Sequence, residues 1–314
     1  MMNRFNNKTL RNKLKATAIS SIWFSHNIAF SSLKKPYEPD HVASFIINGL
    51  PKLTELWSEW LSEYGLSVQI TGVFCHQYPQ VEFHMDGGTE TVELADILIV
   101  RRHYSSGKIE KEVATLIQSK MSKDSTRNIS PNDPQYFLYT NWPEFKFKQR
   151  LYSNNKRNIG LIEGQSKYSL ICEDRRYPED NPIWPDSCFW SIVDDLKPNM
   201  ESDCSFASFL EEIVAFERGR EFFSQKETGC EWTKTICELL DVTFNKNLKT
   251  RIFSAPNRGK TAHMSFVKTK NQGQTINMMG MSSGNGSFNH VIEDNDDSIS
   301  GISTILIETF DLKG

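Results

Sequence analysis

The chain has few of the features that mark membrane or secreted proteins. No run of 18 or more apolar residues occurs, so no transmembrane helix is expected. The first residues lack a continuous apolar segment followed by a small-residue cleavage site, so no secretory signal is predicted. Cysteine is scarce, with 6 in 314 residues and no C-x-x-C pair, which predicts free thiols in a reducing cytoplasm and no zinc site.

Three common nucleotide- and metal-binding motifs are also missing, namely G-x-x-x-x-G-K-[ST], G-x-G-x-x-G and H-E-x-x-H. Their absence argues against a P-loop NTPase, a dinucleotide-binding enzyme and an H-E-x-x-H metalloprotease. The net charge of −3 does not by itself indicate a nucleic-acid-binding protein. The charge is uneven, however, because residues 1–35 contain seven lysines and arginines and no acid. That segment is expected either to contact phosphates or to form the solvated face of a helix.

What remains is the pattern of a globular protein, with 38% hydrophobic and 24% charged residues. Apolar periodicity predicts helices over 7–20, 39–64, 205–223 and 231–240, and strands near 67–75, 80–85, 91–102, 112–120, 168–173, 188–193, 262–269 and 302–309. Pro51 is expected to interrupt the second helix and Gly65 to end it. Residues 278–300 are rich in Gly, Ser, Asn and Asp, which predicts a long loop. A helix followed by several strands indicates an α/β fold.

The most informative stretch runs from residue 93 to residue 120. It reads E-L-A-D-I-L-I-V, then a polar turn, then A-T-L-I-Q-S-K, which predicts two antiparallel strands with Asp96 at the head of the first. Gln118 and Lys120 end the second strand and point to the same side, because side chains alternate along a strand. A carboxylate, an amide oxygen and an ammonium group are therefore expected to meet at one edge of a sheet. The oxygens suit a hard cation such as Mg2+, and the lysine can stabilise an attacking hydroxide.

This arrangement resembles the PD-(D/E)xK (restriction-endonuclease-like) nuclease superfamily, in which an aspartate is followed by Glu- or Gln-x-Lys on the next strand. The resemblance covers roughly residues 50–125, and the chain carries the Q-x-K variant found in type IV-like restriction enzymes of bacterial defence. It implies catalytic roles for Asp96, Gln118 and Lys120. It also implies Mg2+ or Mn2+ held by Asp96, Gln118 and the backbone carbonyl of Ser119. An amide binds such a cation more weakly than a carboxylate does.

The resemblance implies an α/β fold with a restriction-endonuclease-like mixed sheet flanked by helices and an additional α+β region toward the C-terminus. Residues 1–150 would form the nuclease core with N-terminal helices. Residues 151–314 would form an accessory region that senses a partner or ligand or completes the fold. The implied function is a divalent-metal-dependent nuclease that cleaves DNA in restriction or anti-phage defence. The alternative is a nuclease-fold protein without activity that binds nucleic acid or a protein partner within a defence complex, and a homo-oligomer is compatible with either.

Four further acids, Glu59, Glu63, Glu82 and Glu93, are candidates for a third metal ligand. Glu63 lies on the acidic face near the end of the helix predicted over 39–64. Glu93 lies three residues before Asp96 and would face away from it on a regular strand, so a bulge would be needed to bring the two together.

Basic residues follow the motif in a polar loop. Lys123 and Arg127 would contact the nucleic-acid backbone there. His76, between two predicted strands, is expected to be either a second general acid or a hydrogen-bonded turn residue. The motif also has a simpler interpretation, in which Lys120 is only the solvated end of a strand. Asp96 fits that interpretation less well, because an unpaired carboxylate among apolar neighbours is costly.

Overall fold

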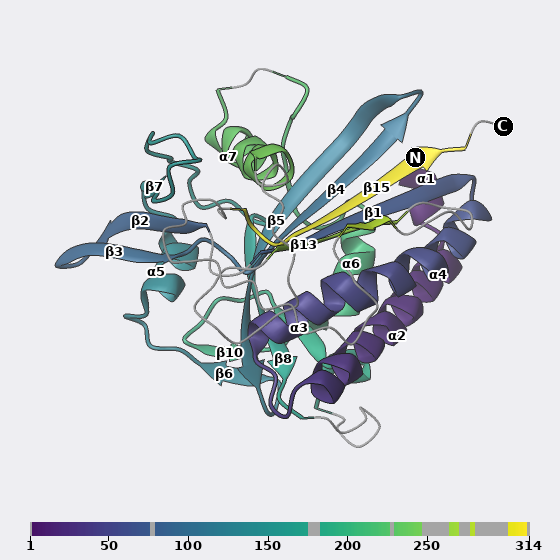
Figure 1. Cartoon of the computed structure of the whole chain (residues 1–314), viewed down its shortest axis with the longest axis horizontal. Helices are drawn as coiled ribbons and strands as arrows, with labels where there is room; N and C mark the ends of the chain where they lie inside the picture. Colours follow the sequence, from purple (N-terminus) through teal and green to yellow (C-terminus); the bar gives the residue numbers. More distant parts are fainter. Residues whose placement is uncertain are drawn as a thin grey trace.

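A ten-stranded sheet organises the computed structural model, which describes residues 2–75, 79–174, 183–226, 229–246, 264–269, 277–279 and 301–312 (Figure 1). The strand order is β11 (Cys204–Ser205), β9 (Trp190–Val193), β8 (Ser166–Cys172), β5 (Lys108–Ser122), β4 (Ile97–Ser105), β15 (Thr304–Asp311), β1 (Leu66–Cys75), β13 (Met264–Thr269) and β14 (Asn277–Met279), and β12 (Arg220–Glu221) also pairs with β5. β15 runs parallel to β4 and β8 parallel to β5, whereas the other pairs are antiparallel. The sheet is therefore mixed.

Both faces of the central strands are buried. In β4, Ile97 and Ile99 enter one hydrophobic core, and Leu98 and Val100 enter the other. A strand covered on both faces needs apolar side chains at successive positions, which explains the run Ile97-Leu98-Ile99-Val100.

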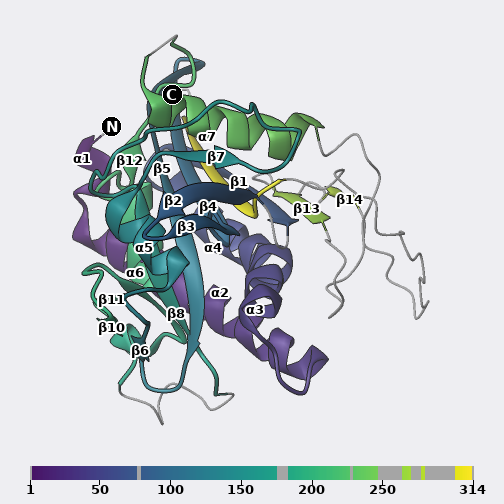
Figure 2. The ribbon, with the colours of Figure 1, turned by 90° about the vertical axis from the view of Figure 1, so that its left-hand side faces the viewer.

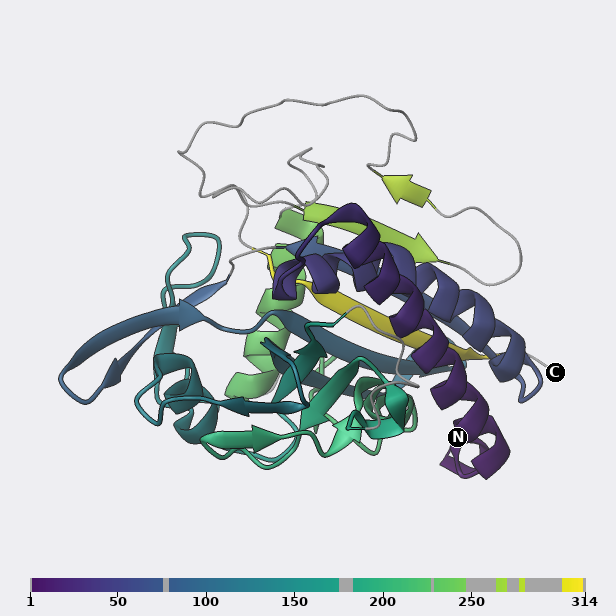
Figure 3. The same ribbon diagram turned by 90° about the horizontal axis from the view of Figure 1, so that it is seen from below.

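Helices from the N-terminal part cover the first face of the sheet. They are α2 (Lys8–Ser32), α3 (Glu38–Ser44) and α4 (Leu50–Ser62), which lie across the sheet in Figure 3, and α6 (Phe206–Val214) packs with them. A π-helical turn, Phe45–Gly49, joins α3 to α4 just before Pro51, which has no N–H to continue α-helical hydrogen bonding. β1 passes close to this junction, since a Cβ added to Gly72 would lie 2.7 Å from Leu50 Cδ1.

The second face is covered by α5 (Pro134–Asn141), α7 (Glu231–Asp241) and a small sheet. The small sheet has the order β3 (Gly88–Glu93), β2 (Gln80–Met85) and β7 (Phe145–Phe147). Figure 2 faces this side and shows the small sheet and α5 together below α7. Phe83 of β2 stacks on Phe137 of α5, with ring centroids 6.0 Å apart, so the small sheet and α5 are packed together.

The remaining elements are short. They are α1 (Met2–Phe5), the strand pair β6 (Thr126–Asn128) and β10 (Asn199–Glu201), a 3₁₀ turn (Pro185–Ser187) and a π-helical turn (Val242–Lys246). Across the described ranges, no helix combines the length and apolar character needed to cross a membrane.

The predicted mixture of helices and strands is confirmed, but several element bounds differ. The helix predicted over 7–20 continues to Ser32 as α2. The strand predicted over 91–102 is two strands, because the chain changes partners: Leu94 N donates to Pro79 O in the small sheet, and Asp96 N donates to Ile117 O in the large one. The helix predicted over 205–223 ends at Val214, and Phe216 takes a positive φ of 62°. Most of the loop predicted over 278–300, and His76, lie outside the described residues.

Strands from both sides of residue 150 alternate within the large sheet. β15 lies between β1 and β4, and β8 lies beside β5. The boundary expected near residue 150 therefore does not divide the sheet, and residues after it supply strands that flank those of the motif.

Candidate functional site

Asp96, Gln118 and Lys120 converge on the second face of the sheet. Ile97 pairs with Ile117 at the start of β4, which sets Asp96 opposite Gln118. Gln118 Nε2 donates to Asp96 Oδ2 at 2.5 Å, and Ser119 N donates to the same oxygen at 2.5 Å. Lys120 follows two residues after Gln118, and its charge acts on Asp96. The expected juxtaposition of acid, amide and ammonium group is present.

The site lies at a free edge of β5. β4 begins at Ile97, but β5 continues past the pairing partner of this residue to Ser122, so its last residues have no β4 neighbour. Two carboxylates take the N–H groups on this edge: Asp96 accepts from Ser119 N, and Glu38 of α3 accepts from Met121 N at 3.1 Å. The Ser119 carbonyl faces the same side, because the N–H and C=O of one strand residue point together. It therefore lies between the two carboxylates.

Burial dominates the protonation of the acids. Loss of solvent raises the pKa of Asp96 to about 6, although the Ser119 N–H and the Lys120 charge favour its ionised form; the Glu38 charge opposes ionisation. Loss of solvent and repulsion from Asp96 raise the pKa of Glu93 to about 8, against the attraction of Lys120. Glu93 therefore lies near Asp96. The chain achieves this by passing from one sheet to the other between the two residues, and not by a bulge within one strand.

The amide of Gln118 is incompletely satisfied. Its side chain is 5% exposed, and among the described residues Oε1 has no hydrogen-bond partner, while Nε2 donates to Asp96. A buried acceptor without a partner costs free energy, and a cation would remove that cost. Among the described residues, no three Asp, Glu, His or Cys side chains are grouped closely enough to hold a metal. The residues nevertheless fit Mg2+, which keeps several waters and needs only one or two carboxylates.

Polar side chains missed by the sequence analysis border the site. Tyr168 of β8 is opposite Gln118, and its buried hydroxyl has no partner among the described residues. Tyr139 of α5 donates its hydroxyl to Leu94 O at 2.9 Å, two residues before Asp96. Burial is the main cause that raises the pKa of both phenols, so they stay protonated at neutral pH. The aromatic side chains of residues 134–142 suit a packed core, and nothing in the sequence there indicates that Tyr139 lies near Asp96.

Gln135 also lies on α5, one turn before Tyr139, and is 8% exposed. Its Nε2 has no hydrogen-bond partner within the described part of the chain. The helix that carries Gln135 could have been predicted, because Asp133 and Pro134 are typical of a helix start. Asp133 accepts from Tyr136 N, and Pro134 takes the first helical position.

The other predicted site residues have different positions. Glu63 caps α4 beside the start of β1 and pairs with Lys13 at 3.4 Å, about 30 Å along the strands from Asp96. The structure does not bring it to the site. Lys123 is exposed in the turn after β5, and the exposed Arg127 donates from Nη1 to Met121 O at 3.4 Å. These two cations therefore lie at the end of β5 that carries the site.

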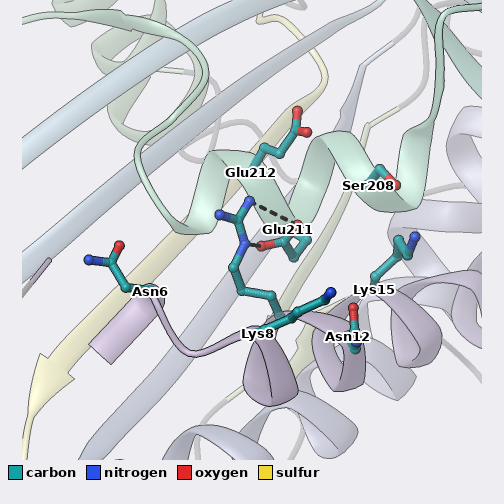
Figure 4. Close-up of a pocket in the computed structure, with 8 residues that line it drawn as sticks. Asn6, Lys8, Asn12, Lys15, Ser208, Glu211 and Glu212 are labelled. Atoms are coloured by element: carbon teal, nitrogen blue, oxygen red, sulfur yellow. Dashed lines mark hydrogen bonds and ion pairs between the residues drawn. The ribbon is translucent and has the colours of Figure 1, made fainter. Parts of the chain in front are cut away.

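The basic N-terminal segment is largely neutralised by acids from other elements. Arg4 pairs with Asp311 at 2.7 Å, Lys15 with Asp186 at 3.1 Å, and Arg11 with Glu211 and Glu217. A pocket of about 340 Å³ lies between the start of α2 and α6, and its lining includes Lys8, Lys15 and Glu211 (Figure 4). Arg11 Nε donates to Glu211 Oε1 at this pocket. The solvated-helix interpretation fits α2 better than a phosphate-binding arm does.

All six cysteines are free thiols, as predicted. No family model, curated protein or solved structure matches the chain. Its function has to be argued from the site.

Proposed function

We propose that the chain is a divalent-cation-dependent nuclease with a restriction-endonuclease-like core, which hydrolyses phosphodiester bonds of DNA in restriction or anti-phage defence. The observation that carries this proposal is the convergence of the buried Gln118 with the half-buried Asp96 and Lys120 at the free edge of β5, with Gln118 Oε1 unpartnered among the described residues. The order of elements also supports it. Helix α4 leads into β1, the strands β4 and β5 are antiparallel to each other, and α5 comes before β8, which runs parallel to β5.

Each residue has a distinct role in this reaction. Asp96, Gln118 and the Ser119 carbonyl would hold Mg2+ or Mn2+, whose chemistry is to lower the pKa of water and offset charge on phosphate. Lys120 orients the attacking water and stabilises the added negative charge of the pentavalent transition state. Water gives up a proton and forms a new bond to phosphorus, one ester P–O bond breaks, and the leaving oxygen takes up a proton from the solvent.

A catalytically inactive binding protein with the same core is the second candidate. The observation that favours it is that Asp96 already accepts hydrogen bonds from Gln118 and Ser119 and so stabilises the end of β5 without a metal. In that case the site would be structural, and Lys123 and Arg127 would serve to bind nucleic acid or a partner protein.

Cleavage of plasmid DNA with Mg2+ or Mn2+ tests the first proposal. Asp96→Asn and Lys120→Ala should both abolish cleavage, whereas Lys108→Ala should not, because Lys108 is exposed at the opposite end of the same strand. Nucleic-acid binding without cleavage in every variant would favour the second candidate. Cleavage that persists in Asp96→Asn and Lys120→Ala would refute the site.

Gln118→Glu separates a metal ligand from a structural hydrogen-bond donor. The variant loses the Nε2 donor to Asp96 and adds a second charge, so its melting temperature without metal should fall. If the position binds the cation, Mn2+ should raise the melting temperature of Gln118→Glu more than that of the wild type. An equal or smaller rise would show that Gln118 does not contact the cation.

A further inference from the structure

The free edge of β5 carries a second carboxylate that the sequence analysis did not single out. Glu38 is partly buried in the first turn of α3, and its Oε1 accepts from Met121 N. Its charge is felt at Asp96, where it opposes ionisation. Glu38 and Asp96 therefore belong to one electrostatic environment, although 58 positions separate them in the sequence.

The position of Glu38 is fixed by its helix. Asp40 accepts from Tyr37 N at 2.8 Å and so caps the start of α3. One turn after Glu38, the buried His41 ring stacks on His26 of α2, with ring centroids 4.6 Å apart. These contacts hold α3 against α2, so the carboxylate is directed at β5 by an anchored element.

We infer that Glu38 is the second carboxylate of the cation site and that it faces Asp96 across the Ser119 carbonyl. This inference rests on the proposed function. It replaces Glu63 as the acid contributed by the N-terminal helices, because Glu63 lies at the other end of the sheet. Gln118, on the same stretch of β5, is 5% exposed, and its Oε1 has no hydrogen-bond partner among the described residues. This buried acceptor independently indicates that a cation binds there.

The spacing along β5 suits a hydrated cation. The N–H groups of Ser119 and Met121 are two residues apart, which corresponds to about 6.7 Å along a strand. A carboxylate that bound Mg2+ directly would lie about 2.1 Å from it, and one that bound through a coordinated water would lie at most about 4.8 Å away, the limit for a linear arrangement. These two distances sum to nearly the spacing of the two N–H groups. Direct binding by Asp96 and water-mediated binding by Glu38 therefore match the geometry.

Titration of the purified full chain with Mn2+ at pH 7, with free Mn2+ followed by electron paramagnetic resonance, tests the inference. Glu38→Gln removes the charge but keeps an oxygen that can accept from Met121 N. It should weaken Mn2+ binding about tenfold or more, the range expected when a group that orients a metal's surroundings is lost. Glu63→Gln is the matched control, since it removes an exposed acid of the same helical region, and it should bind Mn2+ as the wild type does.

The outcomes separate this inference from the proposed function. If Asp96→Asn loses Mn2+ binding and Glu38→Gln does not, Glu38 lies outside the cation site while the proposed function stands. If the wild type binds no Mn2+ at millimolar concentration, both fail. Glu38→Asp keeps the charge and should bind Mn2+ more tightly than Glu38→Gln. Equal affinities in these two variants would mean that Glu38 only anchors β5, which would overturn the inference.

Discussion

Binding of a divalent cation at Asp96 should release protons, and the pKa values of Asp96 and Glu93 set how many are released at each pH. The pKa of Asp96 is about 6 and that of Glu93 about 8, because both are desolvated. Together they hold about 1.5 protons at pH 6, about 1.0 at pH 7 and about 0.5 at pH 8. A dication beside them favours the ionised forms, so these protons leave when it binds.

Isothermal titration calorimetry measures this release directly. Mn2+ is titrated into the protein at each pH in two buffers with different ionisation enthalpies, and the difference in heat gives the number of protons released. In Glu93→Gln, only the share of Asp96 should remain, so fewer protons should be released at each pH. In Asp96→Asn, binding itself should be lost.

Two results would refute this reasoning. Release of no protons at any of the three pH values would mean that the cation binds away from Asp96 and Glu93. Release that stays the same in Glu93→Gln would mean that the protons come from other groups.

Three further predictions follow from the same geometry. Because the folded-state pKa of Glu93 is raised, its protonation stabilises the fold at low pH, and this contribution is lost as the pH rises from about 4.5 through about 8. Between pH 5 and pH 8 the free energy of unfolding of Glu93→Gln should therefore fall less than that of the wild type. The difference should be about 2 kcal/mol after allowance for partial exposure. Urea denaturation at several pH values measures it, and parallel curves of stability against pH for the two proteins would contradict this prediction. Lys120→Ala removes the positive charge that opposes both pKa shifts, so it should lower the cleavage rate at least ~100-fold and increase proton release on Mn2+ binding at pH 8. Gly72→Ala should cost about 1–3 kcal/mol of stability in thermal denaturation, because its Cβ would lie 2.7 Å from Leu50 Cδ1 and 2.9 Å from Ile46 Cγ2. A loss below about 0.5 kcal/mol would show that these two side chains move aside easily.

The motif strands could be predicted from the sequence because their signals are local. The run Ile97-Leu98-Ile99-Val100 indicates a strand buried on both faces, and alternation alone places Gln118 and Lys120 on one side. The break before Asp96 was not predicted, because it arises when the chain leaves one sheet for another, and that depends on Pro79 and Ile117, distant partners in the fold.

The third acid shows a different limit of sequence analysis. Glu63 shares a helix face with other acids and so gave a clear pattern, whereas Glu38 is the first residue of α3, next to Pro39, with only Asp40 as a second acid in that turn. Which of them approaches Asp96 depends on the direction in which α3 and α4 cross the sheet. No spacing in the sequence specifies that direction, so the nearer acid was passed over in favour of the more regular one.

The position of β15 has a consequence for the order in which the molecule is built. This strand separates β1 from β4, and Ser303 just before it accepts from Leu98 N at 2.7 Å. While a ribosome is still making the preceding 300 residues, β1 and β4 each keep an unpaired edge, and the strand headed by Asp96 lacks a neighbour. Closure of the sheet must then join segments more than 230 residues apart, which predicts slow folding and a period of exposure to aggregation. The candidate site would thus be assembled only after β15 has been made, so chains that stop before residue 304 would not carry it.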